Sequence, residues 1–174
     1  MDRKKVGRTN LEISGLGLGT GTFGREIDEE KSFEIMDYAV ENDITFFDTA
    51  EAYGGGQAHE IRKQAYGTTD VREKSTEMSS SELIIGRWMK SRGTRKDIEL
   101  CTKISGGNAG PDQIRTALDA SLERLGTDFV HIYKIHSPDV NTPIEESLDA
   151  MGEQVDLGKI KIIGGANYNG EQIA

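Results

Sequence analysis

Short apolar segments and amphipathic segments alternate along almost the whole chain. The apolar segments are rich in Ile, Phe, Val and Leu, which is typical of buried strands. They lie at residues 16–19, 44–47, 98–101, 129–135 and 160–163. Strands that alternate with helices form a parallel sheet, so the pattern predicts an α/β fold.

The amphipathic segments carry apolar residues at intervals of three or four, the period of a helix with one buried face. Four complete helices are predicted. Asp28 is the expected N-cap of the first, and Pro111 the expected first residue of the third. Capping boxes at residues 79–82 and 142–145 should start the second and the fourth.

Two segments do not follow this alternation. Residues 1–14 hold two short strand candidates on either side of a polar turn, which predicts an N-terminal β-hairpin. Residues 57–78 are polar and have no sustained period, so we expect an inserted loop there. All of these elements are assigned to one domain, residues 1–174.

The spacing of the strands indicates which α/β fold is present. The last three candidates begin at Ile98, Phe129 and Ile160, about 31 residues apart, which is the length of one unit in an eight-unit barrel. The prediction is therefore a (β/α)8 TIM-barrel type of fold with only its first five strands and four helices present. Such a partial barrel has open sheet edges, which must be covered or paired. We expect a fragment of a longer protein, or self-association through these edges.

Composition restricts the partners and the location. The chain is 35% hydrophobic and 29% charged, as in soluble globular proteins, and no apolar run approaches the length of a membrane span. A net charge of −9 argues against nucleic acid or an anionic membrane as the main partner. The single cysteine, Cys101, suits a reducing compartment, and the N-terminus has no secretion signal. A cytoplasmic protein is predicted.

A polar residue follows each predicted strand at its C-terminal end: Thr20, Asp48, Lys103, His136 and Asn167. The active sites of α/β barrels lie on this face. Each residue alone has a structural explanation, since Asp48 can end a strand, Lys103 can be solvated and His136 can be a hydrogen-bonded structural histidine. Five such residues in step favour a functional site.

Tyr53, in the loop after Asp48, completes an acid–base group. A lysine cation close to a phenol makes the phenol a better proton donor, and a carboxylate on the far side keeps the lysine charged and in position. A histidine close by can hold a carbonyl oxygen. Tyr53 could equally be a half-buried loop tyrosine without a catalytic role. No metal site is predicted.

Six segments resemble, in order and spacing, the aldo-keto reductase superfamily: LGLGTGTFG, ITFFDTAEAYGGG, LCTKIS, SLERLGTDFVHIYKIHSPD, TPIEESLDAM and GKIKIIGGANYN. The resemblance covers nearly the whole chain. It implies an (α/β)8 barrel and NADPH-dependent reduction of an aldehyde or ketone to an alcohol. On that pattern Tyr53 is the general acid, Lys103 and Asp48 tune it, and His136 orients the carbonyl.

The same resemblance implies how NADP(H) is held. Asn167 would bind the nicotinamide carboxamide, and Gly19 and Thr20, together with Asp48, would line the reactive end of the cofactor. Ala166 stands where relatives commonly have serine, so one hydrogen bond to the nicotinamide is absent.

Lys134 stands where relatives usually have an uncharged residue such as glutamine. By strand alternation it should face the barrel interior beside His136. A second buried cation there would lower the pKa of either lysine or change what the site binds. Lys134 and Ala166 keep one alternative open, a non-catalytic NADP-binding or regulatory protein on the same barrel. A further alternative, an inactive truncated fragment, rests on the absence of the later strands.

Residues 19–24 also match G-x-G-x-x-G, with an acid downstream at Asp48, which is the pattern of a Rossmann dinucleotide site. This alternative is weaker. The preceding strand is unusually rich in glycine, and the helix is predicted to start at Asp28 rather than at the third glycine.

Overall fold

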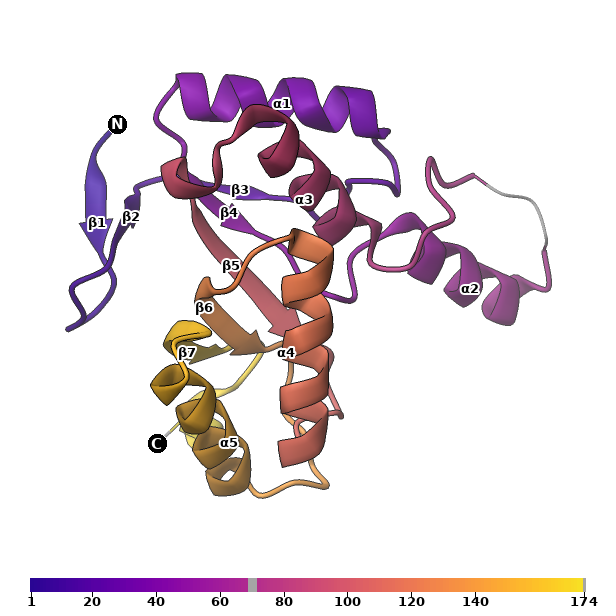
Figure 1. Cartoon of the computed structure of the whole chain (residues 1–174). Coiled ribbons are helices and arrows are strands. Elements are labelled where there is room, and N and C mark those ends of the chain that lie inside the picture. The colour runs from indigo at the N-terminus through magenta and orange to yellow at the C-terminus, as the bar shows by residue number, and fades with distance from the viewer. Residues whose placement is uncertain (69–71, 174) are drawn as a thin grey trace.

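The computed structural model describes residues 1–68 and 72–173 (Figure 1). Five parallel strands form one sheet in chain order, β3-β4-β5-β6-β7. Their bounds are Gly17–Gly19 (β3), Phe46–Asp48 (β4), Glu99–Ile104 (β5), Val130–Ile135 (β6) and Ile160–Gly165 (β7). This sequential order is that of a barrel wall. A Rossmann sheet reverses its order at the cofactor crevice, so the Rossmann alternative is wrong.

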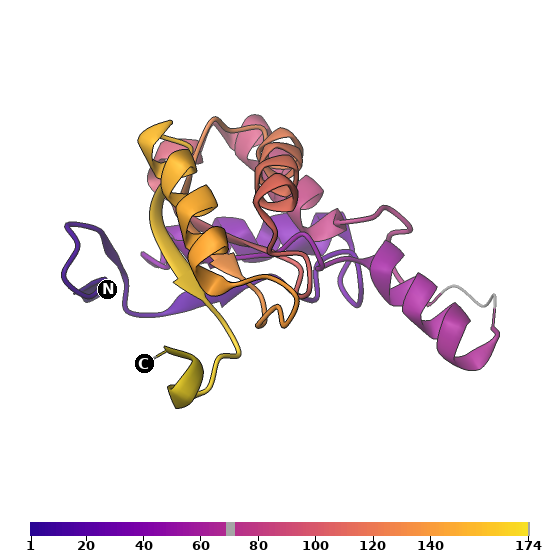
Figure 2. The ribbon, with the colours of Figure 1, turned by 90° about the horizontal axis from the view of Figure 1, so that it is seen from below.

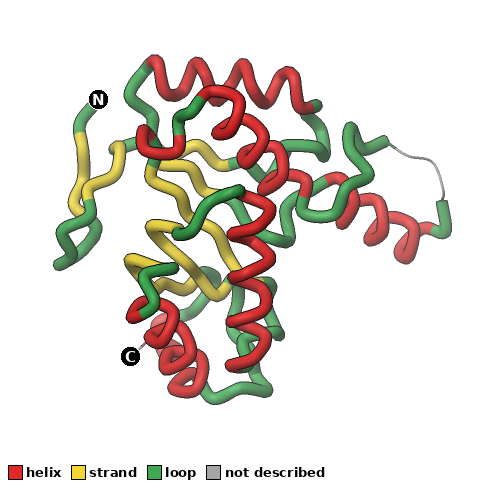
Figure 3. Tube along the Cα trace, viewed as in Figure 1, coloured by secondary structure: helices red, strands yellow, loops and turns green. Residues whose placement is uncertain are grey.

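Four long helices accompany this sheet, and α3, α4 and α5 pack on one of its faces (Figures 2 and 3). The helix bounds are Glu29–Glu41 (α1), Ser80–Arg92 (α3), Pro111–Leu125 (α4) and Ile144–Asp156 (α5). A 3-10 turn, Arg95–Asp97, precedes β5, and a short helix, Gly170–Ile173 (α6), follows β7. The four predicted helices and five predicted strands are therefore confirmed.

The helix-covered face of the sheet holds the core. Phe47, Leu100 and Tyr133 are completely buried, and the Phe47 ring lies 5.5 Å from the ring of Trp88 in α3. Because side chains alternate along a strand, the neighbours of these residues point to the other face. Core packing therefore determines which polar side chains reach the barrel interior.

The N-terminal β-hairpin is confirmed. Strands Arg3–Lys5 (β1) and Glu12–Ser14 (β2) pair antiparallel. The Ser14 hydroxyl accepts hydrogen bonds from the backbone N–H groups of Thr45 and Phe46, and Arg3 pairs with Glu99 at 2.5 Å. These partners lie at the N-terminal ends of β4 and β5, so the hairpin packs at the end of the sheet opposite to the predicted site.

The prediction of an inserted loop at residues 57–78 is wrong for the first half of that segment. Gly55–Tyr66 forms a helix, α2, that projects from the body of the molecule (Figure 1). Its sequence is rich in helix-forming Ala, Gln, Glu, Lys and Arg. It has no apolar stripe, and of its residues only Gly55 and Gly56 are buried, so the pattern of apolar residues gave no sign of this helix. Arg62 pairs with Glu73 of the returning chain. Residues 69–71 of the predicted insertion lie outside the described residues.

Both predicted capping boxes are wrong. Ser79 precedes α3 in a left-handed conformation and makes no cap hydrogen bond, while Glu82 is fully buried and bonded to Thr102 and Arg124. The Thr142 hydroxyl donates to Asp139 rather than capping α5. Glu82 and Thr142 bond to partners outside their own helix instead of capping it. The caps predicted at Asp28 and Pro111 are confirmed.

Candidate active site

Four of the predicted site residues meet at the C-terminal ends of β4, β5 and β6. Asp48 is the last residue of β4, Lys103 lies near the end of β5, and His136 follows β6. Tyr53 reaches the same place from the loop after β4, where its backbone N–H donates to Ala50 and its carbonyl accepts from Ser81. The sheet brings together residues that are far apart in the sequence.

Lys103 is the centre of this group. Only 4% of it is exposed, and its ammonium donates to three oxygens: a carboxylate oxygen of Asp48, the carbonyl of Thr49 at 2.7 Å and the hydroxyl of Tyr53 at 3.4 Å. The ammonium also lies 4.7 Å from the centre of the Tyr53 ring. The cation is thus held against the phenol, as predicted from the strand ends.

His136 lies beside the same phenol. The His136 and Tyr53 rings are 5.4 Å apart and meet edge to face, at 78°. Burial, followed by the charge of Lys103, lowers the pKa of His136 below its usual value. The imidazole is therefore neutral near pH 7 and can donate one hydrogen bond to an oxygen in front of Tyr53.

Asp48 is ionised by its neighbours. Burial alone raises the pKa of its carboxyl group, but the hydrogen bond and charge of Lys103, and then Lys134, outweigh burial and hold the pKa below its usual value. Cys101, on the same strand as Lys103, is completely buried, and burial raises the pKa of its thiol to about 12. It is a packed strand residue, as the sequence indicated.

Lys134 also joins the group. Its ammonium lies 3.2 Å from the Asp48 oxygen that does not face Lys103, so the prediction that it points into the barrel interior is confirmed. Burial lowers the pKa of Lys134, but its interactions with neighbouring groups, among them the ionised Asp48 carboxylate, outweigh burial, and the net direction is upward. The alternative in which Lys134 has a lowered pKa is therefore wrong.

The residues predicted to line the cofactor occupy different environments. Gly19 is exposed, with open space where a Cβ would be, and lies in register with Asp48. Thr20 is completely buried, its hydroxyl 3.1 Å from the Asp48 carbonyl and 2.8 Å from the Ser81 hydroxyl. Asn167 is exposed and donates its side-chain N–H to the His136 carbonyl at 2.7 Å.

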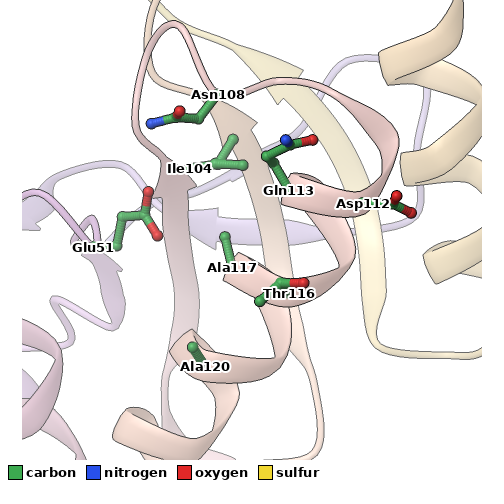
Figure 4. A pocket seen from close by; sticks show the side chains of 8 residues that line it. All are labelled: Glu51, Ile104, Asn108, Asp112, Gln113, Thr116, Ala117 and Ala120. Carbon is green, nitrogen blue, oxygen red and sulfur yellow. The ribbon is translucent and has the colours of Figure 1, made fainter.

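Glu51 is a site neighbour that the sequence reasoning missed, although it lies between Asp48 and Tyr53. Its carboxylate accepts the backbone N–H of Ser105 at 2.6 Å. It lines a cavity of about 370 Å³ next to α4 (Figure 4). The remaining lining residues are Ile104, Asn108, Asp112, Gln113, Thr116, Ala117 and Ala120.

Within residues 1–68 and 72–173, no three His, Cys, Asp or Glu side chains gather as metal ligands. No helix in the same ranges is long and apolar enough to cross a membrane. The fold and the site together therefore define a chain of α/β-barrel type with a Tyr–Lys–Asp–His acid–base group at the C-terminal ends of its strands.

Comparison with known proteins agrees with this class. Residues 15–174 match the Aldo/keto reductase family. The chain is 37% identical to the uncharacterized oxidoreductase YrpG of Bacillus subtilis, covering 98% of this chain and 50% of that protein. It is 33% identical to a probable voltage-gated potassium channel subunit beta of Arabidopsis thaliana, covering 99% of this chain and 48% of that one.

Solved structures give the same result. The thermostable aldo-keto reductase Tm1743, in complex with the inhibitor epalrestat, has a TM-score of 0.79 and 32% identity, covering 99% of this chain and 56% of its own. An aldo-keto reductase from Klebsiella pneumoniae in complex with NADPH has a TM-score of 0.73 and 26% identity, covering 93% and 48%.

The chain belongs to the aldo-keto reductase family, whose members are oxidoreductases, and its sheet and helices are part of a TIM-type barrel. The predicted family and fold class are confirmed. The chain spans about half the length of the curated relatives it matches.

Proposed function

We propose that the protein to which this chain belongs is an NADPH-dependent oxidoreductase that reduces an aldehyde or ketone to an alcohol. The observation that carries this proposal is the contact of the Lys103 ammonium with the Tyr53 hydroxyl, within a group that Asp48 and His136 complete. The family, and the NADPH bound to the Klebsiella pneumoniae structure, support it.

Each residue has one task in this reaction. The cofactor, when bound, supplies a hydride to the carbonyl carbon. Tyr53 gives its hydroxyl proton to the carbonyl oxygen, so that the product is an alcohol. Lys103 stabilises the phenolate left behind, Asp48 holds Lys103, and neutral His136 donates a hydrogen bond that orients the carbonyl oxygen.

The residues at the strand ends fit the nicotinamide end of NADP(H). Gly19 leaves open space beside Asp48, so a flat ring can approach the sheet there. Asn167 uses its side-chain N–H on His136, which leaves its amide oxygen to accept from the nicotinamide carboxamide. Thr20 is assigned to this site through the backbone it holds in place, because its hydroxyl is already bonded to Ser81.

The test is Tyr53→Phe in the whole protein. Losing the proton donor should lower kcat by about 10²–10⁴-fold, the usual contribution of a general acid, while NADPH affinity stays within about twofold. Steady-state kinetics and a fluorescence titration with NADPH measure the two effects. Turnover close to that of the wild type would remove Tyr53 from this role.

A second candidate is a non-catalytic NADP-binding or regulatory protein. The potassium-channel subunit among the relatives, together with the unusual Lys134 and Ala166, favours it. Saturable NADPH binding without reduction of any aldehyde or ketone in a broad panel would support this function and count against the reductase. In both cases we propose a cytoplasmic location.

A further inference from the structure

Among the described residues, two ammonium groups in the site share one carboxylate. Asp48 contributes one carboxylate, and its two oxygens pair with Lys103 and Lys134. Glu51, the next carboxylate in the loop, accepts from Ser105 and forms no ion pair with either lysine among the described residues. Asp48, Lys103 and Lys134 taken together therefore have a net charge of about +1, in a chain whose total is −9.

The two lysines differ in how many hydrogen-bond donors they have left. Lys103 is surrounded by Asp48, Thr49 and Tyr53, so all three of its N–H groups have an oxygen partner. Lys134 has one oxygen partner in the described part of the chain, Asp48, and 24% of its side chain is exposed. Lys134 also hydrogen-bonds to the Cys101 thiol, so its ammonium keeps one of its three donors for a further anion.

The sheet gives Lys134 its position. It lies in register with Lys103 on one side and with Gly164 of β7 on the other. A Cβ at Gly164 would lie 3.2 Å from the Lys134 side chain, so the absence of a side chain at Gly164 gives the lysine its room. The upward pKa shift of Lys134 agrees with an ammonium that stays charged.

We propose that Lys134 is a specificity-determining residue that binds a carboxylate on the substrate, and that the substrates are short oxo acids. In such compounds the carboxylate lies next to the carbonyl, and Lys134 is close enough to the site for its charge to act on His136. A charge-assisted hydrogen bond in a half-buried site is stronger than a neutral one, so it favours the acid over its ester. This proposal rests on the proposed function of the protein.

The experiment compares benzoylformate with its methyl ester, which differ in charge but share the carbonyl. The kcat/KM of both is measured with NADPH in the wild type, Lys134→Gln and Lys134→Arg. Lys134→Gln should lower kcat/KM for the acid at least tenfold more than for the ester, and Lys134→Arg should recover most of the preference. Equal losses for acid and ester in Lys134→Gln would overturn the proposal, leaving Lys134 as a residue that only supports Asp48.

Lys96→Gln is the matched control, because it removes the same charge from an exposed turn before β5. A similar change of acid preference in Lys96→Gln would assign the effect to overall charge and overturn the proposal. Thermal unfolding with each compound gives a readout that does not need turnover. One outcome is that neither compound is reduced while benzoylformate stabilises the wild type but not Lys134→Gln. That result supports carboxylate binding by Lys134 and counts against the proposed function. Equal stabilisation by acid and ester overturns the role of Lys134.

Discussion

Lys103 and Asp48 show how single residues act in this site. A buried ammonium is costly unless it is paired, and Lys103 is 4% exposed with three oxygen partners. Its partners come from the end of β4 and the loop after it, so the group can form only when β4 and β5 lie side by side. The lysine therefore links the packing of the sheet to the position of the Tyr53 hydroxyl, the proton donor that we propose.

Asp48 should make stability depend on pH. Its folded-state pKa lies below the ordinary value of about 3.9, so its ionisation stabilises the fold above about pH 4, and this contribution disappears as the pH falls through the folded pKa. Asp48→Asn should lower the free energy of unfolding at about pH 7, and the difference from the wild type should shrink below about pH 4. Urea denaturation at several pH values measures this.

Asp128→Asn is the control for that experiment, because Asp128 is exposed on the loop before β6. Its effect should be small at every pH. A loss of stability in Asp48→Asn that is the same at about pH 7 and about pH 3 would show that Asp48 acts through packing rather than through its charge.

At the scale of elements, the junction at the base of α2 depends on a glycine. A Cβ at Gly55 would lie 2.0 Å from the Ser75 carbonyl oxygen and 2.2 Å from that of Gly24. These are backbone atoms, so they cannot turn aside as a side chain can. The first residue of α2, a helix that the sequence pattern did not predict, therefore packs tightly against the backbone at Gly24 and Ser75.

Two alanine substitutions test this junction. Gly55→Ala should destabilise the protein by about 1–3 kcal/mol, since an inserted methyl group meets backbone. Gly152→Ala, in the middle of α5 with nothing within 4 Å of the new Cβ, should stabilise it by about 0.5–1 kcal/mol. Chemical denaturation of both variants measures the difference. Equal effects of the two changes would contradict the close packing at Gly55.

At the scale of the whole fold, β7 pairs with β6 alone within the described residues. Ile144 and Leu148 of α5 are 38% and 45% exposed, whereas Met151 on the same helix is completely buried. A cavity of about 580 Å³ between α5 and β7 is lined by Ile144, Leu148 and Ile163 among others. An apolar face beside an unpaired strand favours association.

The 174-residue chain should therefore self-associate as its concentration rises. Replacing Ile144 and Leu148 together by serine should weaken this association at least severalfold, as measured by sedimentation. Leu157→Ser is the matched control, because Leu157 is 67% exposed but does not line the cavity. A chain that stays monomeric at all concentrations would contradict the prediction, and so would an equal effect of Leu157→Ser.

Most residues of the candidate site could be predicted from the sequence, because the end of a strand can be recognised from a short segment. Asp48, Lys103 and His136 each follow an apolar segment, and parallel strands place such residues at one edge. Thr20 had the same signal, but it is buried against Ser81 of α3, which no local pattern predicts. The capping box predicted at Glu82 was wrong for a similar reason: Glu82 bonds to Thr102 and Arg124, which are distant in the sequence.

By itself the sequence determined the order of strands and helices, the N-terminal hairpin and the residues that come to the C-terminal ends of the strands, because period, spacing and turn chemistry are properties of short segments. Tertiary structure alone decided that Lys134 shares Asp48 with Lys103, that Gly164 leaves room for the Lys134 side chain, and that α2 begins at the tightly packed Gly55. Those outcomes depend on distances between residues far apart in the chain, and such distances are set only once the strands have paired and the helices have packed on the sheet.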